Sequence, residues 1–268
     1  MVTSLREHWR HYVIEAAALG AFMAVVGIVA VALAKLPDPA RSFMTAHAML
    51  HRLIFGTAMG LTAIAIVYSP WGRTSGAHIN PAVTLTYFLL DKMGFYDALF
   101  YVAAQFLGAT IVFAAVARLL EPAIAQPEIH YVVTQPGMFG PFVALGAEFA
   151  IAFVMMTAIL HLSNSSRFAR YTGLCAGALV AAYITFEAPL SGMSLNPART
   201  FASAFVAGDP TALWIYFIAP PAGMLTAALV YVYARGARSV RCAKLNHPAT
   251  GECIFRCGYR QSQEQRYA

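Results

Sequence analysis

The amino-acid sequence predicts an all-α membrane protein with six transmembrane helices and two re-entrant half-helices, arranged as an inverted repeat. Three observations lead to this fold class. Of the 268 residues, 59% are hydrophobic and only 11% are charged, against about 25% charged in a typical soluble domain. Six apolar segments are long enough, or nearly so, to cross about 30 Å of hydrocarbon as helices. One motif occurs twice, once in each half of the chain.

Polar residues 1–11 come first, and we expect them to form a cytoplasmic N-terminus. The apolar segment after them is too long for the hydrophobic region of a cleavable signal peptide. Residues 12–234 are expected to form one membrane domain of two repeats, about 12–119 and about 142–234, and residues 235–268 a basic cytoplasmic tail. The expected spans are Tyr12–Ala34, Leu53–Pro70, Tyr96–Leu119, Phe142–Leu162, Tyr171–Ala188 and Leu213–Ala234.

The motif that occurs twice is a helix start. It reads Ser75-Gly76-Ala77-His78-Ile79-Asn80-Pro81-Ala82-Val83 in the first half and Ser191-Gly192-Met193-Ser194-Leu195-Asn196-Pro197-Ala198-Arg199 in the second. Asn is a preferred N-cap residue, and Pro at the first helical position costs nothing because its missing N–H would have had no partner there. The helices that follow, Asn80–Leu90 and Asn196–Val206, are too short to span a bilayer. Such segments at matching places in two halves are typical of half-helices that enter from opposite faces and meet near the midplane.

Other landmarks repeat at nearly the same spacing. Gly56-x-x-x-Gly60 in the second span corresponds to Gly173-x-x-x-Gly177 in the fifth. Small residues four positions apart let two helices approach closely where they cross, and we expect that packing role here. Each repeat contains three spans, an odd number, so the two repeats must have opposite orientations in the membrane.

Orientation follows from the basic residues. If both termini are cytoplasmic, thirteen of the eighteen Lys and Arg residues lie on the inside, seven of them in the tail. This bias favours both termini inside, in a cell (plasma or inner) membrane. The net charge of +6 is then explained by the same rule and by a tail that faces an anionic leaflet, without a nucleic-acid partner.

Three of the four cysteines lie in the tail. Cys242, Cys253 and Cys257 surround His247, but their spacing matches no standard zinc motif. The sequence therefore predicts reduced, unpaired thiols and no metal or cofactor, with a metal site as the weaker alternative. Cys175 lies inside an apolar span, where we expect a small buried hydrophobic side chain.

Two carboxylates, Glu15 and Glu148, lie within apolar spans at matched positions of the repeats. A proton relay is one interpretation. The other is structural, because non-helical backbone ahead of each half-helix carries N–H groups that must be satisfied away from water. The spans hold no further acids or histidines along these positions, which favours the structural role.

Arg199 breaks a local rule. A cation in the first turn opposes the helix dipole, and an apolar surrounding adds several kcal/mol to its cost. Violated local rules are expected at functional sites.

On these residues the chain resembles the aquaporin (major intrinsic protein) family over about residues 12–234. The resemblance rests on both Ser-Gly-x-x-x-Asn-Pro-Ala motifs, on Arg199 after the second, on Glu15 and Glu148, and on Gln105-x-x-Gly108 with Pro220-x-x-Gly223. It implies one pore per subunit in a homotetramer within the lipid bilayer, conducting water and excluding ions and protons.

The residues fit such a pore. Two facing half-helix N-termini place partial positive charge at the centre, and Asn80 and Asn196 can direct a side-chain N–H into the pore while capping their helices. A central water would then turn its hydrogens outward on both sides, which interrupts proton hopping. The remaining expected pore residues supply a carbonyl ladder or line the vestibule: Gly76, Ala77, His78, Gly192, Met193 and Ser194.

Within the family, Thr200 after Arg199 and the pair Tyr216-Phe217 fit the water-type pattern and not the glycerol-type one. The constriction departs from the water-type pattern. The aromatic expected in the second span aligns with Met59, the usual histidine aligns with Ile184, and Met193 precedes the second Asn. Loop insertions also keep neighbouring positions as candidates: Phe55, Tyr183 and Thr185.

This filter leaves open whether small neutral solutes such as glycerol, ammonia or hydrogen peroxide also pass. Three other classes fit less well. A secondary transporter needs titratable or cation-coordinating groups at the midplane. A structural or adhesive membrane protein would have no need of Arg199. A membrane enzyme would need a catalytic or metal-ligand cluster in its spans, and the sequence shows none there.

Overall fold

The computed structural model describes residues 1–247 and 253–259, and within them it contains helices and turns but no strand. In this part of the chain, short α-helices and four 3-10 helices occur between and after the long helices. The α-helices are α1 (Val2–Ala34), α2 (Asp38–Ala46), α3 (Ala48–Tyr68), α4 (Pro70–Ser75), α5 (Pro81–Leu89), α6 (Phe95–Leu120), α7 (Pro141–Ser163), α8 (Thr172–Phe186), α9 (Ala188–Ser191), α10 (Pro197–Ala207) and α11 (Leu213–Arg235). The 3-10 helices are η1 (Ala123–Ala125), η2 (His130–Val132), η3 (Ala169–Tyr171) and η4 (Ala237–Ser239).

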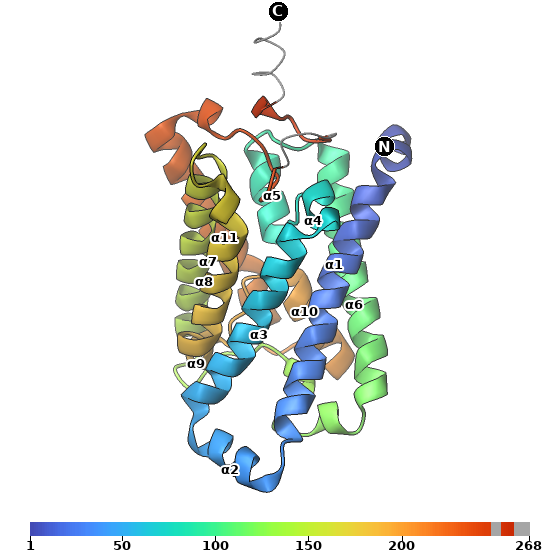
Figure 1. The fold of residues 1–268 in the computed structure, drawn as a ribbon, viewed down its shortest axis with the longest axis vertical. Coiled ribbons are helices and arrows are strands. Elements are labelled where there is room, and N and C mark those ends of the chain that lie inside the picture. The colour runs from blue at the N-terminus through green and yellow to red at the C-terminus, as the bar shows by residue number, and fades with distance from the viewer. Residues whose placement is uncertain (248–252, 260–268) are drawn as a thin grey trace, which may run out of the picture.

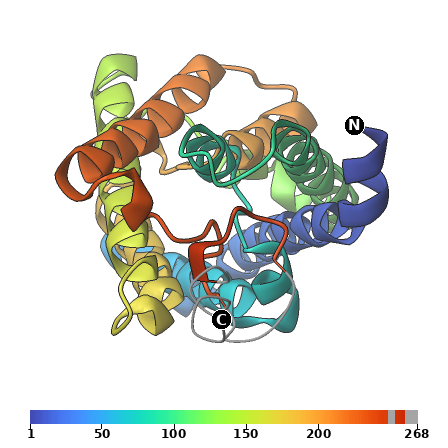
Figure 2. The same ribbon diagram turned by 90° about the horizontal axis from the view of Figure 1, so that it is seen from above.

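Long helices form a ring around the two short helices α5 and α10 (Figures 1 and 2). α1 packs on α6 and α7 packs on α11, which are corresponding pairs of the two repeats, and α3 packs on α8 across the repeats. α5 lies in the half of the bundle that holds the N-terminus and the described part of the tail, and α10 lies in the opposite half (Figure 1). We call these two ends the tail side and the far side.

Within the described residues, five helices are long and apolar enough to cross a membrane: α1, α3, α6, α7 and α11. The fifth expected span differs, because α8 has only 15 residues, about 22 Å at 1.5 Å per residue. The helix ends at Phe186 and the chain restarts after one residue as α9, whose Pro189 occupies a first-turn position. α8 nevertheless lies along α3 as the sixth member of the ring (Figure 1).

Glycines lie where helices cross. A Cβ on Gly60 would collide with the backbone oxygen of Gly177, and one on Gly177 would collide with the oxygen of Gly60, so α3 and α8 meet backbone to backbone. Gly108 meets α1 at Ala16, and Gly223 meets α7 at Phe149, in the same way. Because lipid offers no hydrophobic driving force between helices, such close contact supplies the packing energy.

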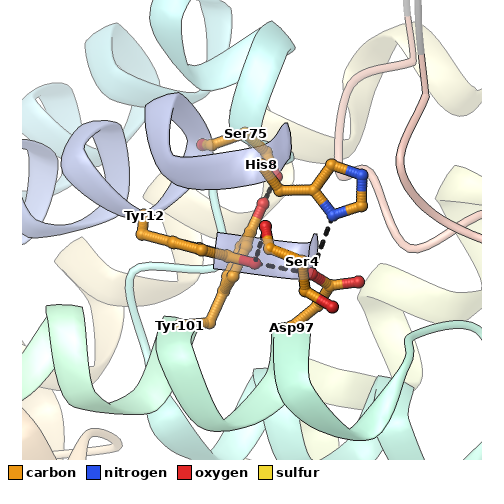
Figure 3. A network of polar contacts seen from close by, with 6 residues as sticks. All are labelled: Ser4, His8, Tyr12, Ser75, Asp97 and Tyr101. Atoms are coloured by element: carbon orange, nitrogen blue, oxygen red, sulfur yellow. Dashed lines mark hydrogen bonds and ion pairs between the residues drawn. The ribbon is translucent and has the colours of Figure 1, made fainter. Parts of the chain in front are cut away.

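The polar N-terminus continues α1 as a helix, and Figure 3 shows how a polar network fixes it to α6. The hydroxyl of Tyr12 donates to the Asp97 carboxylate at 2.6 Å, and His8 Nδ1 lies 2.8 Å from the same oxygen. The hydroxyl of Tyr101 donates to the backbone oxygen of Ser75 at 2.7 Å. These bonds hold α1 against α6, and α6 against the stretch that precedes α5.

Candidate functional site

A cavity of about 1120 Å³ runs through the bundle. It reaches from Arg41 on α2 and Gln126 in the α6–α7 connection at the far side to Leu245 of the tail. Its walls come from both repeats, and the two non-helical stretches before α5 and α10 cross it at the middle. We call these stretches the first re-entrant stretch (residues 75–80) and the second re-entrant stretch (residues 191–196).

Asn80 and Asn196 connect the two stretches. Oδ1 of Asn80 accepts the N–H of Ala82 at 2.8 Å, and Oδ1 of Asn196 accepts that of Ala198 at 3.1 Å, so each side chain caps its half-helix. Nδ2 of Asn80 donates to the carbonyl oxygen of Leu195 at 2.8 Å, and Nδ2 of Asn196 donates to that of Ile79 at 2.7 Å. An amide nitrogen carries two hydrogens. Each asparagine therefore retains one further N–H beside the cavity, which both side chains line.

Both stretches adopt the same unusual backbone. Ala77 and Ile79 have φ of 54° and 40°, and their counterparts Met193 and Leu195 have φ of 52° and 57°. Non-glycine residues in this region cost on the order of 1–3 kcal/mol each, and such strain persists only where the surroundings fix it. The repetition of this costly backbone in both halves marks the place where the chain turns its peptide groups toward the cavity.

Glu15 of α1 supports the first stretch. It is fully buried and accepts four hydrogen bonds: from the Ser75 hydroxyl at 2.8 Å, the His78 N–H at 3.1 Å, the Ile79 N–H at 2.6 Å and Gln105 Nε2 at 2.8 Å. The carboxylate thus satisfies the backbone donors that the helical ladder does not reach. It does not line the cavity.

Glu148 of α7 has the same position in the second repeat. It is fully buried and accepts from the Ser191 hydroxyl at 2.9 Å, the Ser194 N–H at 2.5 Å and the Leu195 N–H at 2.8 Å. It also interacts electrostatically with Arg199. Like Glu15, it lies behind the stretch and not in the cavity wall, which is the geometry of a structural acceptor.

The predicted constriction residues come together. Met59, Ile184, Met193 and Arg199 all line the cavity and are each less than a tenth exposed. Among the alternative positions, Phe55 also lines it, whereas Tyr183 and Thr185 do not. Apart from Arg199, these predicted constriction positions supply thioether and aliphatic side chains to the wall.

Arg199 supplies a charged group to the cavity wall, and Arg52 of α3, which donates Nε to the Thr185 carbonyl oxygen at 3.0 Å, lines the same cavity. The Arg199 residue is 8% exposed, and its Nη1 is buried without a hydrogen-bond partner among the described residues. Val83 has the corresponding position in the first repeat and also lines the cavity. The site is thus cationic on one side of the centre and apolar on the other.

Gly76 departs from the sequence expectation. Its carbonyl oxygen accepts the N–H of Leu245 at 3.1 Å, and the residue does not line the cavity, unlike Ala77, His78, Gly192 and Ser194, which do. The acceptor ladder of the first stretch is therefore shortened by a tail segment. Nothing in the local sequence predicts this, because the partner lies far along the chain.

His78 is held by the same tail segment. Its Nδ1 lies 3.1 Å from Thr84 Oγ1, its Nε2 lies 2.8 Å from the carbonyl oxygen of Ala243, and its ring stacks on Phe255 at 5.5 Å. The sequence predicted a tail that faces a lipid leaflet. The described part of the tail instead packs into the tail-side mouth (Figure 2).

At the far side, the α6–α7 connection covers the second stretch. The N–H of Gly137 donates to the Leu190 carbonyl oxygen at 2.9 Å, and Asp209 after α10 accepts from His130 Nε2 at 2.9 Å and Gln135 Nε2 at 2.7 Å. Hydrogen bonds from Thr211 and His130 lower the pKa of Asp209 to about 2. The carboxylate is thus ionised over the whole physiological range and ties the connection to α10.

Known proteins share this architecture. The sequence profile described as "Major intrinsic protein" matches residues 2–231. The chain is 36% identical over 200 residues to "Aquaporin NIP2-3" from Zea mays, a match that covers 74% of this chain and 64% of that protein. It is also 36% identical over 174 residues to "Aquaporin NIP1-3" from Oryza sativa subsp. japonica, covering 64% of this chain and 58% of the relative.

These matches span less than two thirds of the length of the curated relatives. Among solved structures, the "X-ray structure of the aquaglyceroporin from Plasmodium falciparum" aligns with a TM-score of 0.65 over 83% of this chain and 94% of that chain. At 19% sequence identity this likeness concerns the fold.

Proposed function

This chain belongs to the major intrinsic protein family, and from that premise we propose that it is a passive membrane channel, not an enzyme, that conducts water and excludes ions and protons. The observation that carries the proposal is the reciprocal pair of asparagine bonds at the centre. The pair holds two half-helix N-termini against each other, which places partial positive charge at the narrow middle of the cavity. Water accepts hydrogen bonds there, whereas a cation meets repulsion.

Proton exclusion follows from the same arrangement. A water that accepts from the free N–H of Asn80 and of Asn196 turns its own hydrogens away from the centre in both directions. The water chain then has opposite orientations on its two sides, which prevents proton hopping through it. Arg199 adds a fixed charge that increases the repulsion of cations.

Small neutral solutes are the second candidate substrates. The observation that favours them is that the cavity wall combines the apolar side chains of Met59, Ile184 and Met193 with the charged Arg199. A solute with hydroxyls on one side and carbon on the other can match such a mixed surface. Methionine side chains also adapt in shape, so the opening accommodates more than one solute.

Stopped-flow light scattering of proteoliposomes tests the proposal. Water permeability should exceed that of protein-free vesicles severalfold, while proton flux stays at the lipid background. Parallel gradients of glycerol, urea and ammonia then decide the second candidate. Water flux at the lipid background, in vesicles that contain folded protein, would contradict the proposal.

The assembly and orientation are proposals as well. We propose a homotetramer, as expected from the family, with both termini in the cytoplasm. The basic residues near the tail-side ends of the helices support this orientation. Cross-linking in native membranes should give a four-chain product, and protease added to intact cells should leave a C-terminal epitope tag uncut.

A further inference from the structure

The strongest unexplained feature of the molecule is a side-chain cluster in the tail. Cys242, His247, Cys253 and Cys257 place their ligand atoms within 4.8 Å of one another. Cys242 Sγ lies 3.6 Å from Cys253 Sγ, and Cys257 Sγ lies 3.1 Å from His247 Nε2. The sequence predicted unpaired thiols here, because the intervals between these residues follow no standard motif. The folded tail brings all four together.

The four ligand atoms lie close enough together for a tetrahedral zinc site. With Zn–S bonds of about 2.3 Å, two thiolates on a tetrahedral ion are about 3.8 Å apart. The Cys242–Cys253 distance of 3.6 Å is close to that edge and far from the about 2.0 Å of a disulfide bond. Three thiolates and one imidazole form the Cys₃His set of closed structural zinc sites, and soft sulfur ligands select zinc over magnesium or calcium.

Charge around the cluster matches such an ion. Zn²⁺ with three thiolates and a neutral imidazole carries a net charge of −1. The same segments contribute Arg241 and Lys244, whereas the guanidinium of Arg256 pairs with Asp91. Cys242 is 2% exposed and Cys257 is 8% exposed, so water is largely excluded from the sulfur atoms.

The cluster lies at the point where the tail folds back on itself. The N–H of Gly258 donates to the Arg241 carbonyl oxygen at 2.7 Å, which brings the two described tail segments together. These segments, 236–247 and 253–259, are mostly irregular chain. So small a unit cannot bury enough apolar surface to hold its shape, and metals commonly supply the missing stability in such units.

The tail that this cluster would stabilise contacts the pore. Leu245 lines the cavity, its N–H binds the Gly76 carbonyl oxygen at 3.1 Å, and Ala243 binds His78 at 2.8 Å. Three further hydrogen bonds fix the tail to the loops around the mouth. The N–H of Arg241 donates to Asn164 Oδ1, and that of Arg256 donates to the Lys92 carbonyl oxygen. The Tyr259 hydroxyl donates to the Ser163 carbonyl oxygen. A change in the fold of the cluster is therefore transmitted directly to the tail-side mouth.

We propose that Cys242, His247, Cys253 and Cys257 bind one Zn²⁺, and that this ion holds the tail as a plug that restricts the tail-side mouth of the pore. The zinc site stands on the cluster geometry alone. The restriction of flux rests on the proposed function. Loss of the ion releases the tail and opens the mouth.

The first measurement is the metal content of the full-length protein, purified in detergent without chelators and loaded with Zn²⁺. We expect one zinc per chain by elemental analysis, with thiolate-to-metal charge-transfer absorption when Co²⁺ replaces it. In C253S/C257S the bound zinc should be lost, whereas C175S, altered in α8 outside the cluster, should retain it. Zinc-free wild-type protein after loading, or a Cys242–Cys253 disulfide in mass spectra, would overturn the site.

The second measurement keeps the wild-type sequence, so a folding defect cannot mimic the result. Tryptic cleavage at Arg241 and Lys244 should be slow with zinc and severalfold faster after chelation, and zinc should restore protection. In proteoliposomes, chelation should raise water permeability severalfold and zinc should lower it again, with C175S as the matched control. Equal cleavage and equal flux in the two metal states would overturn the plug. Absent flux in both states, with zinc-dependent protection intact, would instead contradict only the proposed conduction.

Discussion

The two re-entrant stretches are held by nearly the same set of buried hydrogen bonds, but different segments of the chain pack over them. In each, a buried carboxylate accepts the backbone N–H groups, a serine hydroxyl bonds that carboxylate, and a tyrosine hydroxyl bonds the serine carbonyl oxygen: Tyr101 to Ser75 at 2.7 Å and Tyr216 to Ser191 at 2.5 Å. The first stretch is covered by the tail and the second by the α6–α7 connection. The buried hydrogen bonds that support each stretch therefore come from residues that the two repeats share. The segments that cover the stretches, the tail and the α6–α7 connection, lie outside the repeats.

The inner positions differ as well. His78 and Ser194 correspond, and each bonds the threonine six residues later, His78 to Thr84 at 3.1 Å and Ser194 to Thr200 at 2.5 Å. Only the second half-helix carries a charge in its first turn, Arg199. The comparison teaches that the shared residues build the stretch, whereas the unshared residues determine what passes and from which end passage is controlled.

The largest effect is expected from the shared carboxylates. Glu15→Ala leaves up to four buried donors unsatisfied, at about 1–3 kcal/mol each. Glu148→Ala leaves three and also removes the counter-charge of Arg199. Both variants should lose most of their folded protein, measured by fluorescence-detected gel filtration. Glu7→Ala, at an exposed position of α1, is the control. Wild-type yield from either carboxylate variant would show that the support is dispensable.

The next effect tests the charge difference. Arg199→Val gives the second half-helix the residue that the first has at Val83. A charge a few Å away repels a cation by on the order of 4 kcal/mol at an effective dielectric constant of about 20. Proton or cation leak should therefore rise by about tenfold or more, with water flux retained, in vesicles loaded with a pH-sensitive dye. Unchanged leak in a water-conducting variant would assign ion exclusion to the shared half-helix N-termini alone.

A smaller effect should follow from a change in the apolar part of the cavity wall, which includes Met59, Ile184 and Met193. Ile184→His adds a polar ring where the cavity is aliphatic, and so narrows the constriction. Glycerol permeability should fall more than water permeability when both are measured in the same vesicle preparation. Thr185→Ser is a matched control, because Thr185 is the next residue of α8 and does not line the cavity. An equal decrease in both permeabilities would indicate a general obstruction and not a filter.

The smallest effect on transport selectivity should come from a change in the tail segment that covers the first re-entrant stretch. Phe255→Ala removes a ring that is 5% exposed and stacks on His78, while the half-helices and Arg199 stay in place. Tryptic cleavage of the tail should accelerate, and the ratio of water to glycerol permeability should not change. Phe139→Ala, at an exposed position of the far side, serves as the control. A changed permeability ratio would mean that the tail takes part in selection.

The sequence allowed the support and the fold class to be predicted, because both leave local signals. Paired Asn-Pro-Ala motifs, apolar lengths and glycine spacing each reflect a rule of helix starts or helix crossings. The family resemblance pointed to Met59, Ile184, Met193 and Arg199. All four line the cavity, and their role as a constriction stays a prediction. The short α8 was less accessible, because its end at Phe186 depends on the turn into α9.

The packing of the tail over the first re-entrant stretch could not be predicted from the sequence, for a physical reason. Leu245 binds Gly76, and Cys242 meets Cys257, through contacts that no helical period relates. The one available signal was three cysteines and a histidine in a short basic segment, which spacing rules alone did not favour. Tertiary contacts between irregular segments leave no periodic trace in a sequence.

The reciprocal bonds of Asn80 and Asn196 have a mechanical consequence. They join the two repeats at the bundle centre, because the side chain that caps each half-helix also binds a backbone carbonyl oxygen in the other repeat. An alternating-access carrier moves one repeat as a rigid body against the other. Here such a motion would have to break both hydrogen bonds at once and leave two donors and two acceptors unpaired in an apolar surrounding. We therefore expect the centre of the cavity to keep one conformation, so that any control over passage acts at the two mouths of the cavity.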